Sequence, residues 1–283
     1  MTPTLPRLHL PRRPVLGALL GTLLVAAPAG CTTWPAPTVP MPVRRIAARC
    51  AASARCVLLP GAYSRADDFV SEGFVLDLQR SAPGCELLLA DAHLGYFIEG
   101  QLLRRLREDV VRPGMADAPG EAHGAGQQGD RVDARPWLVG VSLGGMAALA
   151  YAMRHGSEIA GVLAIAPYLG RRELMRDITA AGGPLHWSRL PAVAREPHES
   201  IEDELWRWLV RPGIGSVASG LPIYLGYGRA DRFAETQQML RALLPADHGD
   251  IVDGGHDWPP WRALWQRWLQ RGLLLGVGCG STA

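Results

Sequence analysis

Short apolar runs alternate with helix-like segments along most of the chain. Six runs are almost continuously apolar, which is typical of strands buried on both faces of a parallel sheet. They span residues 56–60, 85–91, 136–142, 161–167, 222–228 and 249–255. Other segments have apolar residues at helical spacing and predict helices over residues 98–112, 143–155, 233–244 and 259–273. This alternation predicts an α/β fold, with a mostly parallel sheet of about six strands flanked by helices.

Two segments interrupt the alternation. Residues 114–134 are rich in glycine, alanine and aspartate and lack apolar periodicity, which indicates a surface insertion. Residues 169–220 separate the fourth and fifth strand candidates and contain two helix-like stretches, ELMRDITAA and IEDELWRWLV. Ligands of α/β proteins bind at the carboxyl ends of the strands. We therefore interpret residues 169–220 as a small helical cap above that edge.

The first thirty residues have the features of a targeting segment. Three arginines precede an unbroken apolar run over residues 15–27, and the sequence PAGC follows it. A basic start and an apolar run too short to span a bilayer comfortably are typical of a signal peptide. We predict a signal peptide over residues 1–30. An uncleaved membrane anchor is the alternative, and it also places the domain outside the cytoplasm.

The sequence AGC at residues 29–31 resembles the end of a bacterial lipobox, in which the cysteine is lipidated after cleavage. It departs from that motif at Pro28, where leucine is usual. The resemblance implies a lipidated Cys31 and an exported, membrane-anchored lipoprotein of the cell envelope, facing the periplasm or the outer membrane. The proline-rich segment over residues 31–45 is then interpreted as a tether, and residues 46–283 as one folded domain.

Charge and composition exclude several classes of function. Removing the three arginines of residues 1–30 leaves 26 basic against 27 acidic residues, a net charge of −1, so we expect no nucleic-acid partner. The chain has no lysine, which excludes Schiff-base and Ser-Lys catalysis. No HExxH motif, paired-cysteine spacing or nucleotide-binding glycine loop occurs, so we predict neither a metal nor a cofactor. Besides Cys31, four cysteines allow three disulfide pairings or stay as thiols: Cys50, Cys56, Cys85 and Cys279.

The clearest chemical signal lies where the third apolar run ends. The stretch WLVGVSLGGMAALA runs from a strand candidate into a helix candidate, with glycine two positions before and two positions after Ser142. A G-x-S-x-G pattern in this context predicts a nucleophile elbow, a sharp turn that exposes a reactive serine. The glycines let the strained turn pack, and the start of the helix favours negative charge. The alternative is a serine that merely caps the helix.

A serine nucleophile needs a base. We predict His256, which follows the last strand candidate in the stretch DGGHDWPPW. Two glycines place it on a flexible turn, and the prolines after it can begin the final helix. The competing histidines are His93, His155 and His186.

The base in turn needs an orienting carboxylate. Asp231 follows the fifth strand candidate in GYGRADRF, between Ser142 and His256 in the chain. This gives the order Ser, Asp, His that the α/β-hydrolase topology requires. Asp257 is a rival, but a residue next to the base rarely turns its carboxylate toward the same ring. Asp253, a second rival, lies too near the strand. We therefore predict a catalytic triad.

The oxyanion hole is predicted from two loops. One donor is the backbone N–H of Leu143, the residue after the nucleophile. The other comes from the loop after the first strand candidate, LPGAYSRADDF, where the Ala62 N–H is the first choice and the Tyr63 N–H the next. The alternative is that this loop is an ordinary Pro-Gly turn.

With these motifs, residues 56–273 resemble a bacterial α/β-hydrolase of the esterase/lipase superfamily. The motifs that carry the resemblance are GVSLGG, GYGRADRF and GGHDWPPW. In that fold the strand at 85–91 is expected at the edge of the sheet, because the chain between Cys31 and Cys56 is too short for the usual first hairpin. The resemblance implies hydrolysis of carboxylic esters or thioesters of small molecules through an acyl-serine intermediate. The alternative from another class is a catalytically silent, hydrolase-like envelope lipoprotein that binds a ligand or partner.

Overall fold

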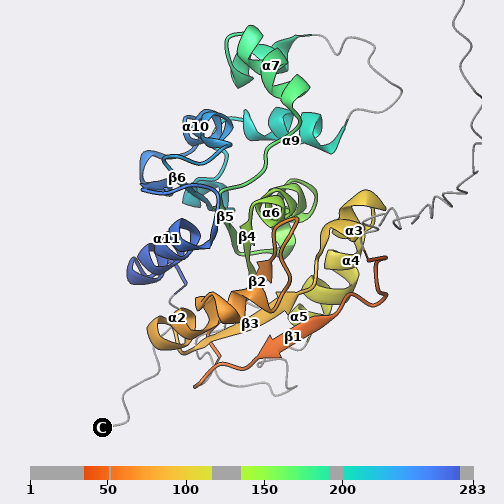
Figure 1. The fold of residues 1–283 in the computed structure, drawn as a ribbon, viewed down its shortest axis with the longest axis vertical. Coiled ribbons are helices and arrows are strands. Elements are labelled where there is room, and N and C mark those ends of the chain that lie inside the picture. The colour runs from red at the N-terminus through yellow and green to blue at the C-terminus, as the bar shows by residue number, and fades with distance from the viewer. Residues whose placement is uncertain (1–34, 51, 117–134, 191–199, 275–283) are drawn as a thin grey trace, which may run out of the picture. The chain divides into compact units, whose positions relative to one another are not determined.

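The computed structural model describes residues 35–50, 52–116, 135–190 and 200–274. They form a seven-stranded sheet in the order β1-β3-β2-β4-β5-β6-β7, in which β1 alone is antiparallel to its neighbour (Figure 1). The strands are β1 Val43–Ile46, β2 Ala54–Leu59, β3 Cys85–Ala90, β4 Trp137–Val141, β5 Gly161–Ile165, β6 Ile223–Gly228 and β7 Gly249–Val252. The predicted fold class, a mostly parallel sheet flanked by helices, is confirmed.

The prediction that the strand at residues 85–91 lies at the edge of the sheet is wrong. β3 does not lie at the edge, because β1 pairs with it in antiparallel register, Val43 opposite Ala90. A single short strand needs no hairpin, so the length of chain before Cys56 did not limit the sheet. The sequence VRRI carries two arginines and is only partly buried, as is usual for an edge strand, and it therefore has no strand-like apolar run. The boundary predicted between tether and domain falls inside this strand.

Residues just before β1 also contact the domain. Met41 is buried, and its backbone N–H donates to the Asp109 carboxylate at 2.8 Å. The Tyr96 hydroxyl donates to the Thr38 carbonyl at 2.7 Å. The described part of the predicted tether is therefore held against the domain. The signal peptide over residues 1–30 and the lipidated Cys31 lie outside the described residues and stay predictions.

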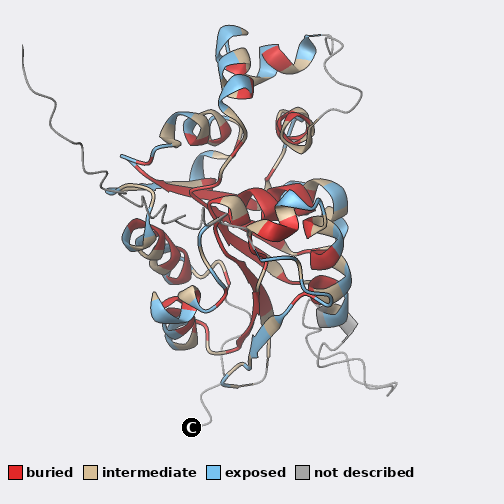
Figure 2. Ribbon diagram, turned by 45° about the vertical axis from the view of Figure 1, so that its right-hand side comes forward, coloured by how far each residue is buried: buried red, intermediate tan, exposed pale blue. Residues whose placement is uncertain are grey.

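Helices cover both faces of the sheet. They are α1 Asp68–Ser71, α2 Phe74–Ser81, α3 Leu94–Ile98, α4 Leu102–Arg105, a π-helical segment Leu106–Val111, α5 Arg112–Ala116, α6 Leu143–His155, α7 Arg172–Ala180, α8 Pro184–Arg189, α9 Ile201–Leu209, α10 Ala234–Arg241 and α11 Trp258–Gln270. One apolar core packs α2 and α11 on one face, and a second packs α4, α6, α9 and α10 on the other. Figure 2 shows the strands as a buried layer between helices whose outer sides are exposed.

The cap predicted at residues 169–220 contains α7, α8 and α9 where it is described. Trp206 and Trp208 of α9 are both buried, and the Trp206 indole N–H donates to the Leu169 carbonyl at 2.8 Å. Both tryptophans therefore pack into the core instead of lining an open pocket. Arg171, which precedes α7, donates to Asp203 of α9 at 3.1 Å.

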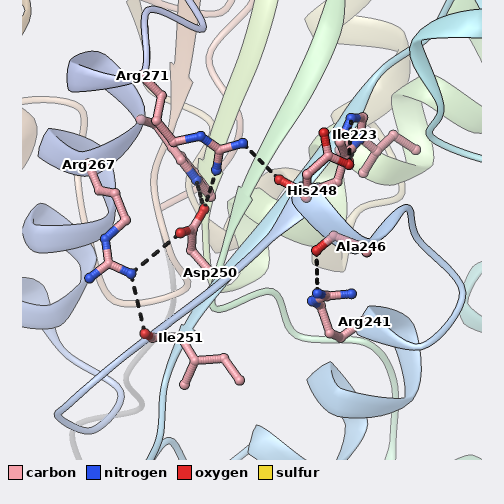
Figure 3. A network of polar contacts seen from close by, with 10 residues as sticks. Ile223, Arg241, Ala246, His248, Asp250, Ile251, Arg267 and Arg271 are labelled. Atoms are coloured by element: carbon pink, nitrogen blue, oxygen red, sulfur yellow. Dashed lines mark hydrogen bonds and ion pairs between the residues drawn. The ribbon is translucent and has the colours of Figure 1, made fainter.

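A polar network fixes the last helix to the last strand. Arg271, which directly follows α11, donates to the Asp250 carboxylate on β7 at 2.7 Å and to the Asp247 carbonyl at 2.7 Å (Figure 3). The Trp268 indole N–H also donates to Asp250, at 2.8 Å. The loop over residues 253–257 joins β7 to α11, and these bonds hold the far end of α11 against the strand from which the loop starts.

The described cysteines differ in state. Cys56 on β2 and Cys85 on β3 are buried free thiols whose sulfur atoms lie 3.2 Å apart. Burial, together with the hydrogen bond to Cys85, raises the pKa of the Cys56 thiol well above its usual value. Cys50 is disulfide-bonded.

Candidate active site

Ser142 stands at a sharp turn between β4 and α6. Its backbone has φ 53° and ψ −116°, a conformation that L-residues rarely adopt and that is typical of strained functional positions. Its N–H donates to the Ile165 carbonyl at 2.9 Å, and its carbonyl accepts from the Tyr168 N–H at 3.0 Å. The last residue of β5 and the loop after it therefore hold the two backbone groups of the serine. The side chain makes no capping hydrogen bond with α6, which argues against a mere helix cap.

The two glycines around Ser142 are needed for close packing. A Cβ added at Gly140 would lie 2.1 Å from the Gly144 carbonyl oxygen. A Cβ added at Gly144 would lie 2.1 Å from the Leu59 carbonyl oxygen. Both contacts are with backbone, which cannot give way as a flexible side chain can. The elbow thus requires glycine at both positions for a local steric reason.

The structure brings Ser142, His256 and Asp231 together at the carboxyl ends of β4, β7 and β6. His256 Nε2 lies 2.9 Å from Ser142 Oγ, and His256 Nδ1 lies 2.8 Å from Asp231 Oδ2. Because a carboxylate only accepts hydrogen bonds, Nδ1 carries the proton of the neutral ring, and Nε2 is left to accept from the serine hydroxyl. The Asp231 side chain is fully buried and the His256 side chain nearly so. This chain of contacts can remove a proton from Ser142.

The three competing histidines lie at other places in the fold. The His93 ring is buried beside Tyr96, and its Nδ1 accepts the Gly95 N–H at 3.1 Å at the start of α3. Burial lowers the pKa of His93 below its usual value. His155 ends α6, on the last turn away from Ser142, and His186 is exposed on α8.

The rival carboxylates point elsewhere. The Asp253 side chain is 97% exposed and lies 3.5 Å from the Arg229 guanidinium. Asp257 is exposed at the start of α11. Asp231 therefore provides the carboxylate in contact with the imidazole, and its second oxygen accepts the Phe233 N–H at 2.8 Å.

The loop expected to complete an oxyanion hole lies beside the serine. A Cβ added at Gly61 would stand 3.3 Å from Ser142 Cβ, so the backbone that precedes Ala62 and Tyr63 runs directly against the nucleophile. Leu143 is the first residue of α6, where backbone N–H groups have no partner within the helix. The Tyr63 side chain is strongly exposed.

The sequence does not predict the two aromatic rings that lie beside the base. Phe233 and Trp261 each stand nearly perpendicular to the His256 ring, with ring centroids 5.0 Å away. Neither residue is marked as a site residue by a motif in the sequence. Phe233 follows β6 and Trp261 lies in α11, so their contacts with the imidazole depend on tertiary structure.

The described residues show neither a metal cage nor a membrane span. Within these ranges, no three histidine, cysteine or acidic side chains are placed to hold a metal ion. None of the helices in the described part of the chain combines the length and apolar character needed to cross a membrane.

A cavity of about 370 Å³ lies at the opposite end of α6 from Ser142. Its walls include the side chains of Arg104, Arg107, Glu108, Arg112 and Arg154. These arginines are paired with carboxylates: Arg104 with Glu108, Arg107 and Arg112 with Glu158, and Arg154 with Glu204. Each of these four arginines has a carboxylate partner within the protein, with Arg107 and Arg112 sharing Glu158, which favours a structural network over a ligand site.

Glu158 in that network makes stability depend on pH. Hydrogen bonds from Arg107, with a further one from Tyr151, lower the pKa of this carboxyl to about 2 from an ordinary 4.5. Since the folded state holds the carboxylate more strongly, its contribution is complete above pH 4.5 and is lost as the pH falls toward 2. We expect Glu158→Gln to lower the free energy of unfolding at pH 7 by about 2 kcal/mol and by less at pH 3. Urea titrations at both pH values measure this, and an equal loss at both would contradict it.

The comparisons with known proteins identify the fold. No protein-family profile matches the chain, and no similar sequence is found among curated proteins. Among solved structures, an arylesterase has 14% identity and a TM-score of 0.53, over 83% of this chain and 80% of that chain. Est1E from Butyrivibrio proteoclasticus has 14% identity and a TM-score of 0.49, over 82% and 91%. An S-formylglutathione hydrolase from Staphylococcus aureus has 13% identity and a TM-score of 0.46, over 78% and 82%. The sheet order and the likeness to the arylesterase show that the chain has the α/β-hydrolase fold.

Proposed function

We propose that this protein is a serine hydrolase that cleaves carboxylic esters or thioesters. The observation that carries the proposal is the chain of hydrogen-bond distances from Ser142 through His256 to Asp231, 2.9 Å and 2.8 Å. It occurs at a strained strand-to-helix turn in an α/β-hydrolase fold. The arylesterase that shares this fold is, as its name says, an esterase, which agrees with the same class of reaction.

In the proposed reaction, Ser142 Oγ attacks the acyl carbon while its proton passes to His256 Nε2. The tetrahedral intermediate collapses, the bond to the alcohol or thiol breaks, and the leaving group takes that proton. Water then attacks the acyl-serine, with His256 again accepting and returning a proton. Asp231 stays ionised and holds the imidazole in the tautomer whose Nε2 accepts.

The negatively charged oxygen of the tetrahedral intermediate needs hydrogen-bond donors that stabilise it. The proposed oxyanion hole consists of the backbone N–H groups of Leu143 and Ala62, with Tyr63 as the next choice. The position of the Gly61 backbone against Ser142 and the start of α6 at Leu143 support this assignment. Mobile hydroxyls are not required, since backbone donors are fixed before the reaction begins.

The substrate is proposed to be a small-molecule ester or acyl compound, met in the cell envelope by a protein anchored through Cys31. Trp206 and Trp208 are buried and therefore give no reason to favour long acyl chains. Water and another alcohol are both chemically able to accept the acyl group from Ser142.

The test is labelling of the purified full chain with a fluorescent fluorophosphonate, followed by peptide mapping. Turnover is measured in parallel on p-nitrophenyl esters and thioesters of increasing chain length. Labelling at Ser142 together with ester turnover is the expected result. A folded chain that neither labels nor hydrolyses any of these substrates would overturn the proposal and favour the silent binding lipoprotein. Transfer to an added alcohol, detected by mass spectrometry, would identify an acyltransferase.

A further inference from the structure

The base at the candidate site is enclosed by aromatic rings from two different elements. Phe233 follows β6, two residues after Asp231, and Trp261 lies in the first turns of α11, five residues after His256. Their rings meet the imidazole at interplanar angles of 90° and 87°. Both rings stand at the same 5.0 Å centroid distance from the imidazole, which also contacts Asp231 and Ser142.

We propose that Phe233 and Trp261 are positioning residues that hold the His256 imidazole in its working orientation. This inference rests on the proposed function, in which His256 Nε2 must reach Ser142 while Nδ1 stays on Asp231. An imidazole on a loop can rotate about its side-chain bonds into solvent, and a misplacement of about 1 Å can cost 10²-fold in rate. Rings packed against it remove those rotations and exclude water from its unbonded surface.

Phe233 is suited to this role because it contacts both partners of the pair. Its backbone N–H donates to Asp231 Oδ1 at 2.8 Å, and its ring packs on the imidazole that Asp231 Oδ2 accepts from. Its other contacts are the Tyr168 ring, at 5.7 Å, and the Arg232 guanidinium, at 4.9 Å. One residue therefore fixes the acid through its backbone and the base through its side chain.

Trp261 is fixed from behind by further aromatic rings. The centroid of its ring lies 5.2 Å from that of Trp258. The Trp258 ring in turn packs against Phe69 and Phe74, with centroid distances of 5.4 Å and 5.6 Å. This cluster belongs to the core that joins α1, α2 and α11. The imidazole is thus supported by a rigid part of the fold, although its own loop is rich in glycine.

The contribution of Trp261 lies in its ring. The indole nitrogen is buried and makes no hydrogen bond to the described residues. A buried donor that bonds to nothing gives no reason to prefer tryptophan over another flat ring. Phenylalanine at this position should therefore keep the orientation of His256, whereas leucine, which is not flat, should not.

The matched control is Trp265, four residues further along α11. It is fully buried in the same core and stacks on Phe74 at 5.6 Å, but none of its recorded ring contacts involves His256. Trp265→Leu should destabilise the protein as much as Trp261→Leu does. A loss of kcat that comes from general destabilisation of the core will appear in both variants. A loss that comes from the position of His256 will appear only in Trp261→Leu.

The experiment measures kcat and KM for the best p-nitrophenyl ester, with the melting temperature, for the full chain and four variants. We expect Trp261→Leu and Phe233→Leu to lower kcat by about 10- to 100-fold. KM should stay within about threefold for both, because substrate binding is not what these rings support. Trp261→Phe and Trp265→Leu should keep kcat within about threefold of the unaltered chain.

Proton NMR of the same proteins provides a readout that needs no activity. The Nδ1 proton of His256, bonded to a buried carboxylate, should give a low-field signal in the unaltered chain, in Trp261→Phe and in Trp265→Leu. The signal should broaden or vanish in Trp261→Leu and Phe233→Leu. If the unaltered chain hydrolyses no ester, the proposed function fails while this arm still tests the positioning. Unchanged kcat and an unchanged signal in both leucine variants, or an equal loss in folded Trp265→Leu, would overturn the inference.

Discussion

Replacement of Ser142 by alanine is expected to lower kcat for ester hydrolysis by about 10⁶-fold, to the level of oxyanion-hole and binding effects alone. The acyl-enzyme requires an oxygen nucleophile, and Ser142 is the hydroxyl in contact with the His256 imidazole. The fold should be retained, since Ser142 Oγ makes no capping bond with α6. Initial rates at saturating p-nitrophenyl ester, with circular dichroism as a check of folding, measure the effect.

A matched control for this variant is Ser71→Ala. Ser71 is exposed at the end of α1, where its hydroxyl donates to the Asp68 carbonyl, and it should have wild-type kcat. The fluorophosphonate label should be retained in this variant and absent from Ser142→Ala. Appreciable turnover by a folded Ser142→Ala protein would place the nucleophile elsewhere and remove the basis of the proposed mechanism.

Replacement of Asp231 by asparagine is expected to lower kcat by about 10⁴-fold. The amide has nearly the shape of the carboxylate, but its NH₂ group can face His256 Nδ1 and act as donor. The imidazole then turns to the other tautomer, whose Nε2 carries the proton and cannot accept from Ser142 Oγ. KM should change little, because the fully buried Asp231 side chain does not reach the substrate. Full kinetic curves over substrate concentration separate the two parameters.

The rival carboxylates serve as controls for Asp231→Asn. Asp253→Asn and Asp257→Asn change exposed side chains that do not contact the imidazole, and both should keep kcat within about threefold. A large loss in Asp257→Asn, with little loss in Asp231→Asn, would show that a different carboxylate supports His256 during the reaction.

Local patterns in the sequence predicted much of this molecule. Helix α6 has the predicted bounds, because its start is marked by the glycines around Ser142 and its length by continuous helix formers. Five of the six parallel strands, β2 to β6, were found because each is apolar over several residues, whereas β7, GDIV, has only two apolar residues. β1 was missed for the opposite reason, since a short edge strand with two arginines has no such run.

The order of the motifs along the chain and their positions at strand ends also predicted Ser142, Asp231 and His256 as site residues, without knowledge of any contact among them. All parallel strands present their carboxyl ends at one edge, so residues that follow such strands are expected to meet there. That rule is a property of the fold class, and it holds at low sequence identity.

The choice among neighbouring side chains was left to the tertiary structure. Asp231, Asp253 and Asp257 all follow strands near the same edge, and only the folded chain decides that Asp231 is buried beside the imidazole while Asp253 faces solvent. The burial of Trp206 and the rings around His256 were equally invisible in the sequence. The sequence by itself determined the elements and the order of the reactive residues, because these follow from local periodicity and turn chemistry. Which side chains touch depends on packing between segments distant in the chain, and only the tertiary structure decided that.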